Sequence, residues 1–106
     1  MKQLVLALFV LALGCAASGV FAANAPVNIV YPIQRDTYAN YVTFEFSTTC
    51  PGGPNDVKWA LDGTGLGSGE FYDTFNAQFQ HKLPPGWHVF EVFSSCGQDA
   101  VKFFVQ

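Results

Sequence analysis

Apolar and polar residues alternate with a period of two along most of the chain beyond residue 26, and no stretch there has the periodicity of a helix. Such alternation is typical of strands with one buried face, because successive side chains of a strand point to opposite sides. The clearest example is residues 40–48, where Val42, Phe44 and Phe46 fall on one face. The opposite face holds Tyr41, Thr43 and Glu45. We therefore predict a half-buried strand over 40–48.

Further segments show the same alternation and are also predicted as strands. They are 27–31, 57–61, 75–83, 87–95 and 100–106, with a short additional strand at 71–72. The side chains expected to face the core are those of Val57, Trp59, Leu61, Phe75, Ala77, Phe79, Leu83, His88, Phe90, Val92, Val101, Phe103 and Val105, with His81 on the same face as Phe79. Prolines and glycines break strand pairing and form turns, so they predict a loop at 50–55 and a corner at 84–86. Six or seven short strands at this spacing predict an all-β fold, an immunoglobulin-like antiparallel β-sandwich.

Several short motifs mark these strands in order. They are Ile29-x-x-Pro32, Phe44-x-Phe46, Trp59-x-Leu61-Asp62-Gly63, Leu83-Pro-x-Gly86-x-His88-x-Phe90-x-Val92 and Val101-x-Phe103-x-Val105. This series resembles bacterial immunoglobulin-like domains and is most similar to the β-sandwich module at the C-terminus of some bifunctional penicillin-binding proteins. The resemblance covers almost all of residues 23–106. It implies the sandwich fold and a non-catalytic module, and it names no partner.

The first 22 residues have the pattern of an export signal. Lys2 is followed by an apolar run over 4–13, and Val20-Phe21-Ala22 fits cleavage before Ala23. The apolar run is shorter than the roughly 20 residues that a transmembrane helix needs. An alternative lies in the same segment, because residues 11–15 resemble a lipobox in which Cys15 is lipidated. We expect one domain over 23–106, periplasmic or secreted, or else anchored to the envelope through Cys15.

Removal of the signal leaves two cysteines, Cys50 and Cys96. Each ends a predicted strand, both at the same pole of the sandwich, and neither has the electropositive neighbours that activate a thiol. An oxidising compartment favours their pairing, so we predict a Cys50–Cys96 disulfide, with two free thiols as the alternative. The remaining four basic and eight acidic residues are scattered, so nucleic acid is not an expected partner.

The segment WALDGTGLGSG, residues 59–69, carries glycines at four alternating positions and is the first candidate for chemistry. A phosphate loop leads into a helix and its P-loop form carries a Lys, whereas this segment lacks Lys and leads into a predicted strand. A calcium site would draw on Asp62, Glu70 and Asp73, but the D-x-D-x-D-G pattern is absent. We therefore predict a glycine-rich turn between two strands.

Other candidate catalytic and metal-binding groups are few. His81 and His88 flank the 84–86 corner, but a metal site would need further ligands, so we expect His88 to bond backbone groups of the corner instead. No Ser-His-Asp or Cys-His order is present. Glu70 and Asp73 are a carboxylate pair without a predicted cleft. The sequence therefore predicts no enzyme activity, cofactor or metal.

The outward residues of the last strands are the strongest candidate for a binding surface. If His88, Phe90 and Val92 face the core, their neighbours in sequence face outward. The candidate interaction face consists of Trp87, Val89, Phe93, Phe104 and Ala60. Exposed apolar patches commonly mark partner sites, so we expect an envelope or extracellular protein partner or self-association. Cover by a loop or by the first strand is the alternative.

A second function class follows from the abundance of aromatic residues. A small carbohydrate-binding module would stack sugar rings on Trp87, or on Tyr38, Tyr41 and Tyr72. Coplanar exposed rings along a groove would favour this glycan-binding hypothesis. A flat apolar face would favour a protein partner.

Overall fold

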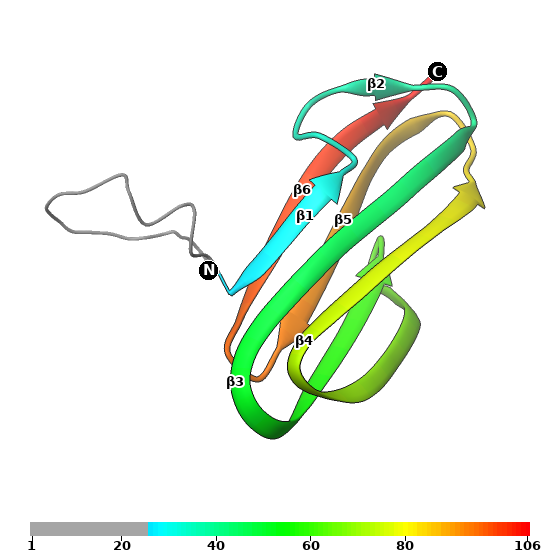
Figure 1. The fold of residues 1–106 in the computed structure, drawn as a ribbon. Coiled ribbons are helices and arrows are strands. Elements are labelled where there is room, and N and C mark those ends of the chain that lie inside the picture. The colour runs from blue at the N-terminus through cyan, green and yellow to red at the C-terminus, as the bar shows by residue number, and fades with distance from the viewer. Residues whose placement is uncertain (1–25) are drawn as a thin grey trace, which may run out of the picture.

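The structure is a computed structural model that describes residues 26–106, and this part of the chain is all β (Figure 1). Its six strands are β1 (Val27–Tyr31), β2 (Thr37–Tyr38), β3 (Tyr41–Leu61), β4 (Thr64–Lys82), β5 (Gly86–Ser94) and β6 (Gly97–Val105). The predicted fold class is confirmed. The predicted export signal and the alternative lipidation at Cys15 lie outside the described residues. No helix between residues 26 and 106 is long and apolar enough to cross a membrane.

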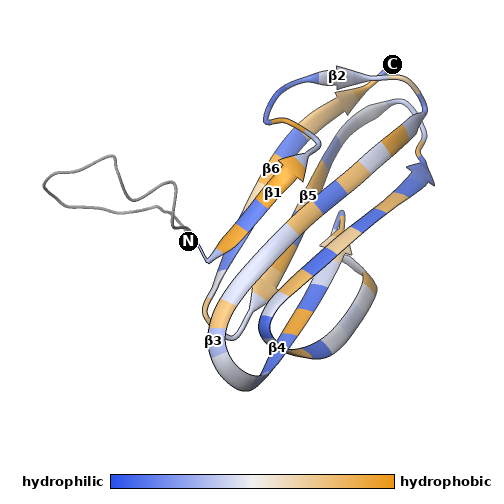
Figure 2. Ribbon diagram, in the orientation of Figure 1, coloured by the Kyte–Doolittle hydropathy of each residue, from blue (hydrophilic) through white to orange (hydrophobic). Residues whose placement is uncertain are grey.

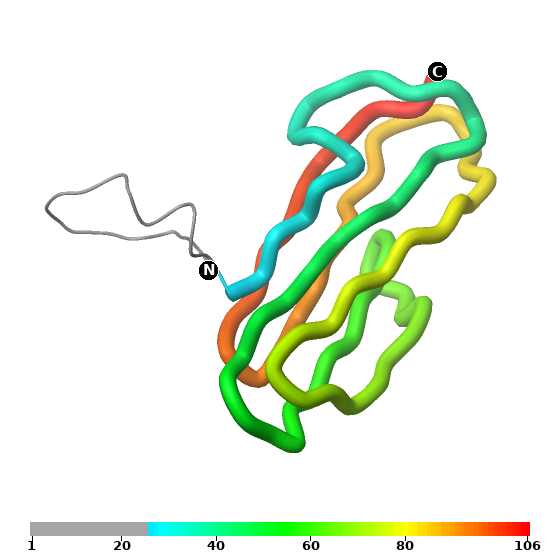
Figure 3. The backbone as a smooth tube through the Cα atoms, viewed as in Figure 1, coloured from blue at the N-terminus to red at the C-terminus, as the bar shows by residue number. Residues whose placement is uncertain are grey.

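Strands β3 and β4 form one long antiparallel ribbon that bends sharply back on itself, as the backbone trace shows (Figure 3). We call residues 41–50 with 73–82 arm 1, and residues 55–61 with 64–71 arm 2. The β3 strand of arm 1 pairs with β1. The β3 strand of arm 2 pairs with β5, which in turn pairs with β6. The single sheet, in the order β1-β3-β5-β6-β2 with β4 beside β3, therefore curls into the two layers of a sandwich. One pairing departs from the predicted antiparallel arrangement, because the short β2 runs parallel to β6.

The bend of the ribbon lies where the sequence predicted a loop. Residues 51–54 stand opposite a single residue of β4, so 50–55 is a wide bulge inside β3 rather than a loop between two separate strands. The side-chain amide of Asn55 donates to the carbonyl oxygens of Cys50 at 2.8 Å and Gly52 at 3.1 Å. The Gly52 N–H donates in turn to Asp73 at 2.8 Å. These bonds satisfy backbone groups that the bulge removes from the ladder.

The predicted inward rows form the core. Figure 2 shows the alternating hydropathy along β3 and β4 that produces them. The buried members of the predicted rows are Val42, Phe44, Phe46, Val57, Leu61, Leu83, His88, Phe90, Val92, Val101, Phe103 and Val105. Trp59, Phe75, Ala77 and Phe79 are only half-buried, and His81 is exposed. Phe44 lies at the centre, stacked on Phe79 with ring centroids 5.0 Å apart and 4.8 Å from the Phe90 centroid.

The predicted disulfide is confirmed. Cys50 and Cys96 are bonded, with their Cα atoms 5.7 Å apart. The bond connects the bend of the ribbon to the tight turn between β5 and β6, across 46 positions of sequence. The two layers are therefore covalently joined at one pole of the sandwich.

Candidate functional site

The candidate interaction face lies on the outer side of the layer that contains β5 and β6. Trp87 pairs with Phe104, Glu91 with Ala60, and Phe93 with Lys58, and all of these alternate with buried neighbours. The structure thus brings all five predicted residues to one side of the layer. Trp87 is 53% exposed, and the other four are half-buried.

Charged side chains interrupt the apolar residues of this face. The Trp87 and Phe104 rings meet edge to face at 5.2 Å, and the ammonium group of Lys102 lies 5.1 Å from the Trp87 ring centroid. At the other end of the face, near the disulfide, the ammonium group of Lys58 lies 5.5 Å from the Phe93 ring. The expected apolar patch is therefore divided in two: the Trp87–Phe104 pair with Lys102 over Trp87 lies at one end, the Phe93 ring with Lys58 over it lies at the other, and smaller side chains separate them.

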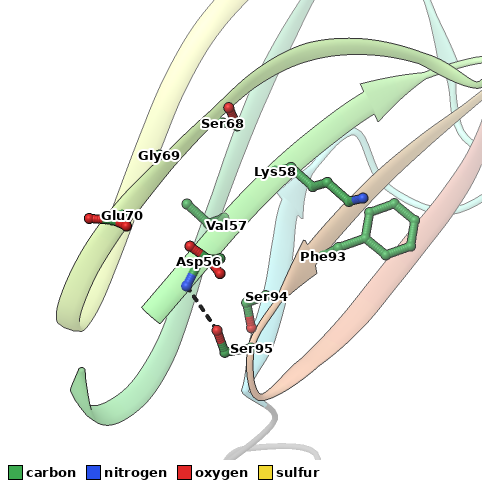
Figure 4. Close-up of a pocket in the computed structure, with 9 residues that line it drawn as sticks. All are labelled: Asp56, Val57, Lys58, Ser68, Gly69, Glu70, Phe93, Ser94 and Ser95. Atoms are coloured by element: carbon green, nitrogen blue, oxygen red, sulfur yellow. Dashed lines mark hydrogen bonds between the residues drawn. The ribbon is translucent and has the colours of Figure 1, made fainter. Parts of the chain in front are cut away.

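An open groove adjoins the disulfide end of this face (Figure 4). It has a volume of about 560 Å³ and is lined by Asp56, Val57, Lys58, Ser68, Gly69, Glu70, Phe93, Ser94 and Ser95. A second depression of about 620 Å³ shares Lys58, Ser68 and Phe93 with it and continues along the glycine-rich part of β4. The sequence analysis did not predict this groove, although the glycines of residues 63–69 were an available signal.

The glycine-rich segment differs from the predicted turn. Only Asp62 and Gly63 form the turn, with φ angles of 52° and 84° that suit a two-residue hairpin of type I′. From Thr64 onward the chain is strand β4. A bulge shifts the pairing so that Gly67 opposes Trp59 and Gly65 opposes Ala60. The glycines at positions 65 and 67 therefore face opposite sides of the layer.

Gly67 is required because the indole of Trp59 lies directly over it. A Cβ atom at position 67 would stand 2.7 Å from Cε2 of Trp59, closer than real carbon contacts. A Cβ atom at Gly65 would meet nothing within 4 Å. The first of these glycines thus accommodates a packed aromatic side chain, whereas the second leaves the outer face hollow.

Asp62 and His88 form a clamp between the arm 2 hairpin and β5. The His88 Nδ1–H donates to Asp62 Oδ2 at 2.6 Å, and the Val89 N–H donates to Oδ1 at 2.8 Å. The His88 Nε2–H donates to the carbonyl oxygen of Pro84 at 2.8 Å, as expected for a histidine that bonds the corner. Burial lowers the pKa of His88, but the bonds to Asp62 and Pro84 outweigh it and raise the pKa above its ordinary value. Both ring nitrogens face acceptor oxygens, so the clamp favours the imidazolium form of His88.

The remaining polar candidates are dispersed. His81 is exposed, and its Nδ1–H donates to the Lys82 carbonyl oxygen at 2.9 Å, away from the His88 clamp. Asp73 accepts a hydrogen bond from the Gly52 N–H of the bulge. Glu70 stands opposite Asp56 on the neighbouring strand, on the outer face. In residues 26–106 no three His, Cys, Asp or Glu side chains are placed to hold a metal ion.

The tyrosines named for glycan binding also lie apart. Tyr38 is half-buried against Phe103, with ring centroids 6.0 Å apart, and its hydroxyl accepts from the Ile33 N–H at 2.7 Å. Tyr41 and Tyr72 are 63% and 65% exposed, but one begins β3 and the other lies opposite the bulge. None of these three tyrosines is the cross-strand partner of Trp87, which is paired with Phe104.

No protein-family model, curated protein or solved structure matches this chain. The resemblance to bacterial immunoglobulin-like domains therefore stays a prediction that rests on the motifs given above. The surfaces of residues 26–106 are the basis for a functional proposal.

Proposed function

We propose that this protein is a non-catalytic binding module of the bacterial cell envelope that recognises another protein through the outer face of β5 and β6. The observation that carries this proposal is Trp87, a large ring 53% exposed beside the half-buried Phe104. Tryptophan and tyrosine are over-represented among residues that dominate binding energy at protein interfaces. The ring and its neighbour thus form the anchor of the interface.

The cations on this face define the chemistry of the partner. Lys102 and Lys58 stand over the Trp87 and Phe93 rings, one toward each end of the face. A partner that presents an acidic side chain to each lysine and an apolar side chain between them would match this arrangement. Glu91, between the two ends, would disfavour a uniformly acidic partner.

A non-catalytic role is supported by what the polar groups do. Asp62 and His88 hold a hairpin to β5, and Asp73 and Asn55 close the bulge of the ribbon. Each of these groups already has structural hydrogen-bond partners, so none is poised as a nucleophile or general base.

Export is supported by the disulfide. Cysteine pairs persist in the periplasm and outside the cell and are rare in the cytosol. The Cys50–Cys96 bond agrees with the export signal predicted over residues 1–22. We propose a periplasmic or secreted protein, with lipid anchoring through Cys15 as the alternative.

The test compares which envelope proteins are captured by the purified native protein and by two matched variants. Trp87→Ala and Tyr41→Ala each remove one exposed aromatic side chain, but only Trp87 lies on the proposed face. We expect an envelope protein that is captured by the native protein to be lost with Trp87→Ala and retained with Tyr41→Ala. Equal capture by both variants would contradict the proposed face.

Carbohydrate binding remains the second proposal, and it rests on the same exposed Trp87 ring. Lys102 already lies over that ring, and Tyr41 and Tyr72 lie elsewhere, so a platform of coplanar rings is missing among these residues. Titration with soluble cell-wall glycan fragments distinguishes the two functions. A saturable change in tryptophan fluorescence that disappears in Trp87→Ala would favour the glycan.

A further inference from the structure

Arm 1 ends in a long, regular and unpaired strand edge. In residues 26–106, β4 pairs with β3 alone, so its other side has no strand beside it. From Asp73 to Lys82 the β3–β4 pairing runs without a register shift. Residues 74–80 contain no proline and no charged side chain. Prolines, charged side chains and bulges protect most natural sheet edges from pairing with another chain. Because this stretch lacks them, its edge is able to pair.

The hydrogen-bonding groups of the free edge follow from the pairing of arm 1. The Thr49 N–H donates to Pro26 on the β1 side at 2.8 Å, so the neighbouring Thr48 turns its N–H and C=O toward β4. Thr48 pairs with Phe75, which therefore turns its own groups back toward β3. Alternation along β4 then directs the N–H and C=O groups of Asn76, Gln78 and Gln80 to the free edge.

Half-buried apolar side chains accompany this edge. Phe75, Ala77 and Phe79 face the core, but all three remain partly exposed. Their cross-strand neighbours Phe46 and Phe44 are 1% and 0% exposed. A further strand along β4 would cover the exposed part of these side chains.

The charges at the two ends of the edge make it self-complementary. Asp73 stands at one end, and His81 and Lys82 stand at the other. We propose that this edge pairs antiparallel with the same edge of a second copy, across a two-fold axis at Ala77. Phe75 then stands opposite Phe79 of the second copy, and Asp73 opposite His81. Because the interface uses β4 rather than the outer face of β5 and β6, it does not depend on the proposed function.

The register follows from the faces of the strand. Directly opposed residues share a face, so the two-fold axis must pass through a residue rather than between two residues. An axis at Asn76 would place Asp73 opposite a phenylalanine, and an axis at Gln78 would place His81 opposite one. Only the axis at Ala77 pairs phenylalanine with phenylalanine and places the Asp73 carboxylate opposite the His81 imidazole.

A cysteine substitution tests this register directly. In the proposed dimer the two Ala77 residues form a non-hydrogen-bonded pair with Cα atoms about 4.5 Å apart, within the range of a disulfide. Ala77→Cys should therefore give a covalent dimer on mild oxidation, seen by intact mass without reductant. Gln80→Cys is the control, because its two copies would lie roughly 20 Å apart. A monomeric Ala77→Cys, or equal crosslinking of both variants, would overturn the proposal.

A proline substitution tests the edge without a crosslink. Gln78→Pro removes an N–H that points to the free edge, so the β3–β4 ladder keeps its bonds. Sedimentation of the full-length protein should show dimerisation that this variant weakens about tenfold or more. Trp87→Ala should leave dimerisation unchanged while it abolishes partner capture. A native protein that stays monomeric, or a Gln78→Pro variant that dimerises normally, would refute the edge as an interface.

Discussion

The two arms of the β3–β4 ribbon are held in different ways, although they are built from the same two strands. Arm 1 is stabilised by side-chain packing, in which Phe44 stacks on Phe79 and Phe46 contacts Phe75. Arm 2 has glycine at several positions of β4 and contributes fewer side chains. Two links hold it at its ends instead: the Cys50–Cys96 disulfide joins the bend, where arm 1 passes into arm 2, to the β5–β6 turn, and the Asp62–His88 clamp holds the hairpin.

The same difference affects the free edges. Uninterrupted packing keeps arm 1 regular, and a regular edge is able to pair with another strand. In arm 2 the bulge between Gly65 and Gly67 breaks the ladder, and Glu70 adds a charge on the outer face. Regular packing thus leaves an edge exposed, whereas the irregular arm is protected from strand addition.

The largest expected effect comes from removing the disulfide that ties the bend between the two arms to the β5–β6 turn. Replacement of Cys50 and Cys96 together by serine should lower the free energy of unfolding by about 4 kcal/mol, since a loop of this length is no longer closed in the unfolded chain. Urea unfolding measures the loss. Hydrogen exchange should rise first in 55–61, and equal loss of protection in both arms would contradict the contrast between them.

The next effect concerns Trp59, whose ring packs against the glycine-rich strand of arm 2. Gly67→Ala places a methyl group against Trp59 and should cost about 1–3 kcal/mol by overpacking. Gly65→Ala, where the space is open, should change stability by less than about 0.5 kcal/mol. Thermal unfolding of the two variants checks this pair. Similar melting temperatures would mean that the indole does not need a glycine beneath it.

Arm 1 contains one polar defect in its packed face. The hydroxyl of Thr48 is buried and has no hydrogen-bond partner. Thr48→Val keeps the shape and removes the unsatisfied group, so stability should rise by about 1 kcal/mol. Thr43→Val, which alters a less buried hydroxyl of the same strand, is the control. A loss of stability in Thr48→Val would show that the hydroxyl is satisfied.

The smallest expected effect is the pH dependence of the arm 2 clamp. The raised pKa of His88 means that the folded state favours the imidazolium. This stabilisation is complete below the unfolded pKa of about 6.5 and is lost as pH rises through the higher folded value. Urea unfolding should therefore show falling stability above about pH 6.5. His88→Gln should remove this slope and His81→Gln should keep it; an unchanged slope in His88→Gln would contradict the assignment.

The sequence alone determined which face of each strand is buried and which cysteines pair. Val42, Phe44 and Phe46, like His88, Phe90 and Val92, follow a two-residue period that any paired strand must obey, so their burial was predictable. The disulfide was predicted from the expected export and from the positions of the two cysteines. The outward placement of Trp87, Val89, Phe93, Phe104 and Ala60 was predictable for the same reason.

The tertiary structure alone decided how distant strands are aligned. The contact of Asp62 with His88 depends on the register between β3 and β5, and strand periodicity does not encode that register. Strict alternation would place Gly65 and Gly67 on the same face of β4. The bulge between them places these two glycines on opposite faces. The lysines over Trp87 and Phe93 come from paired strands rather than from the same strand as the rings. Local periodicity specifies the faces of strands, whereas packing between strands specifies which side chains meet.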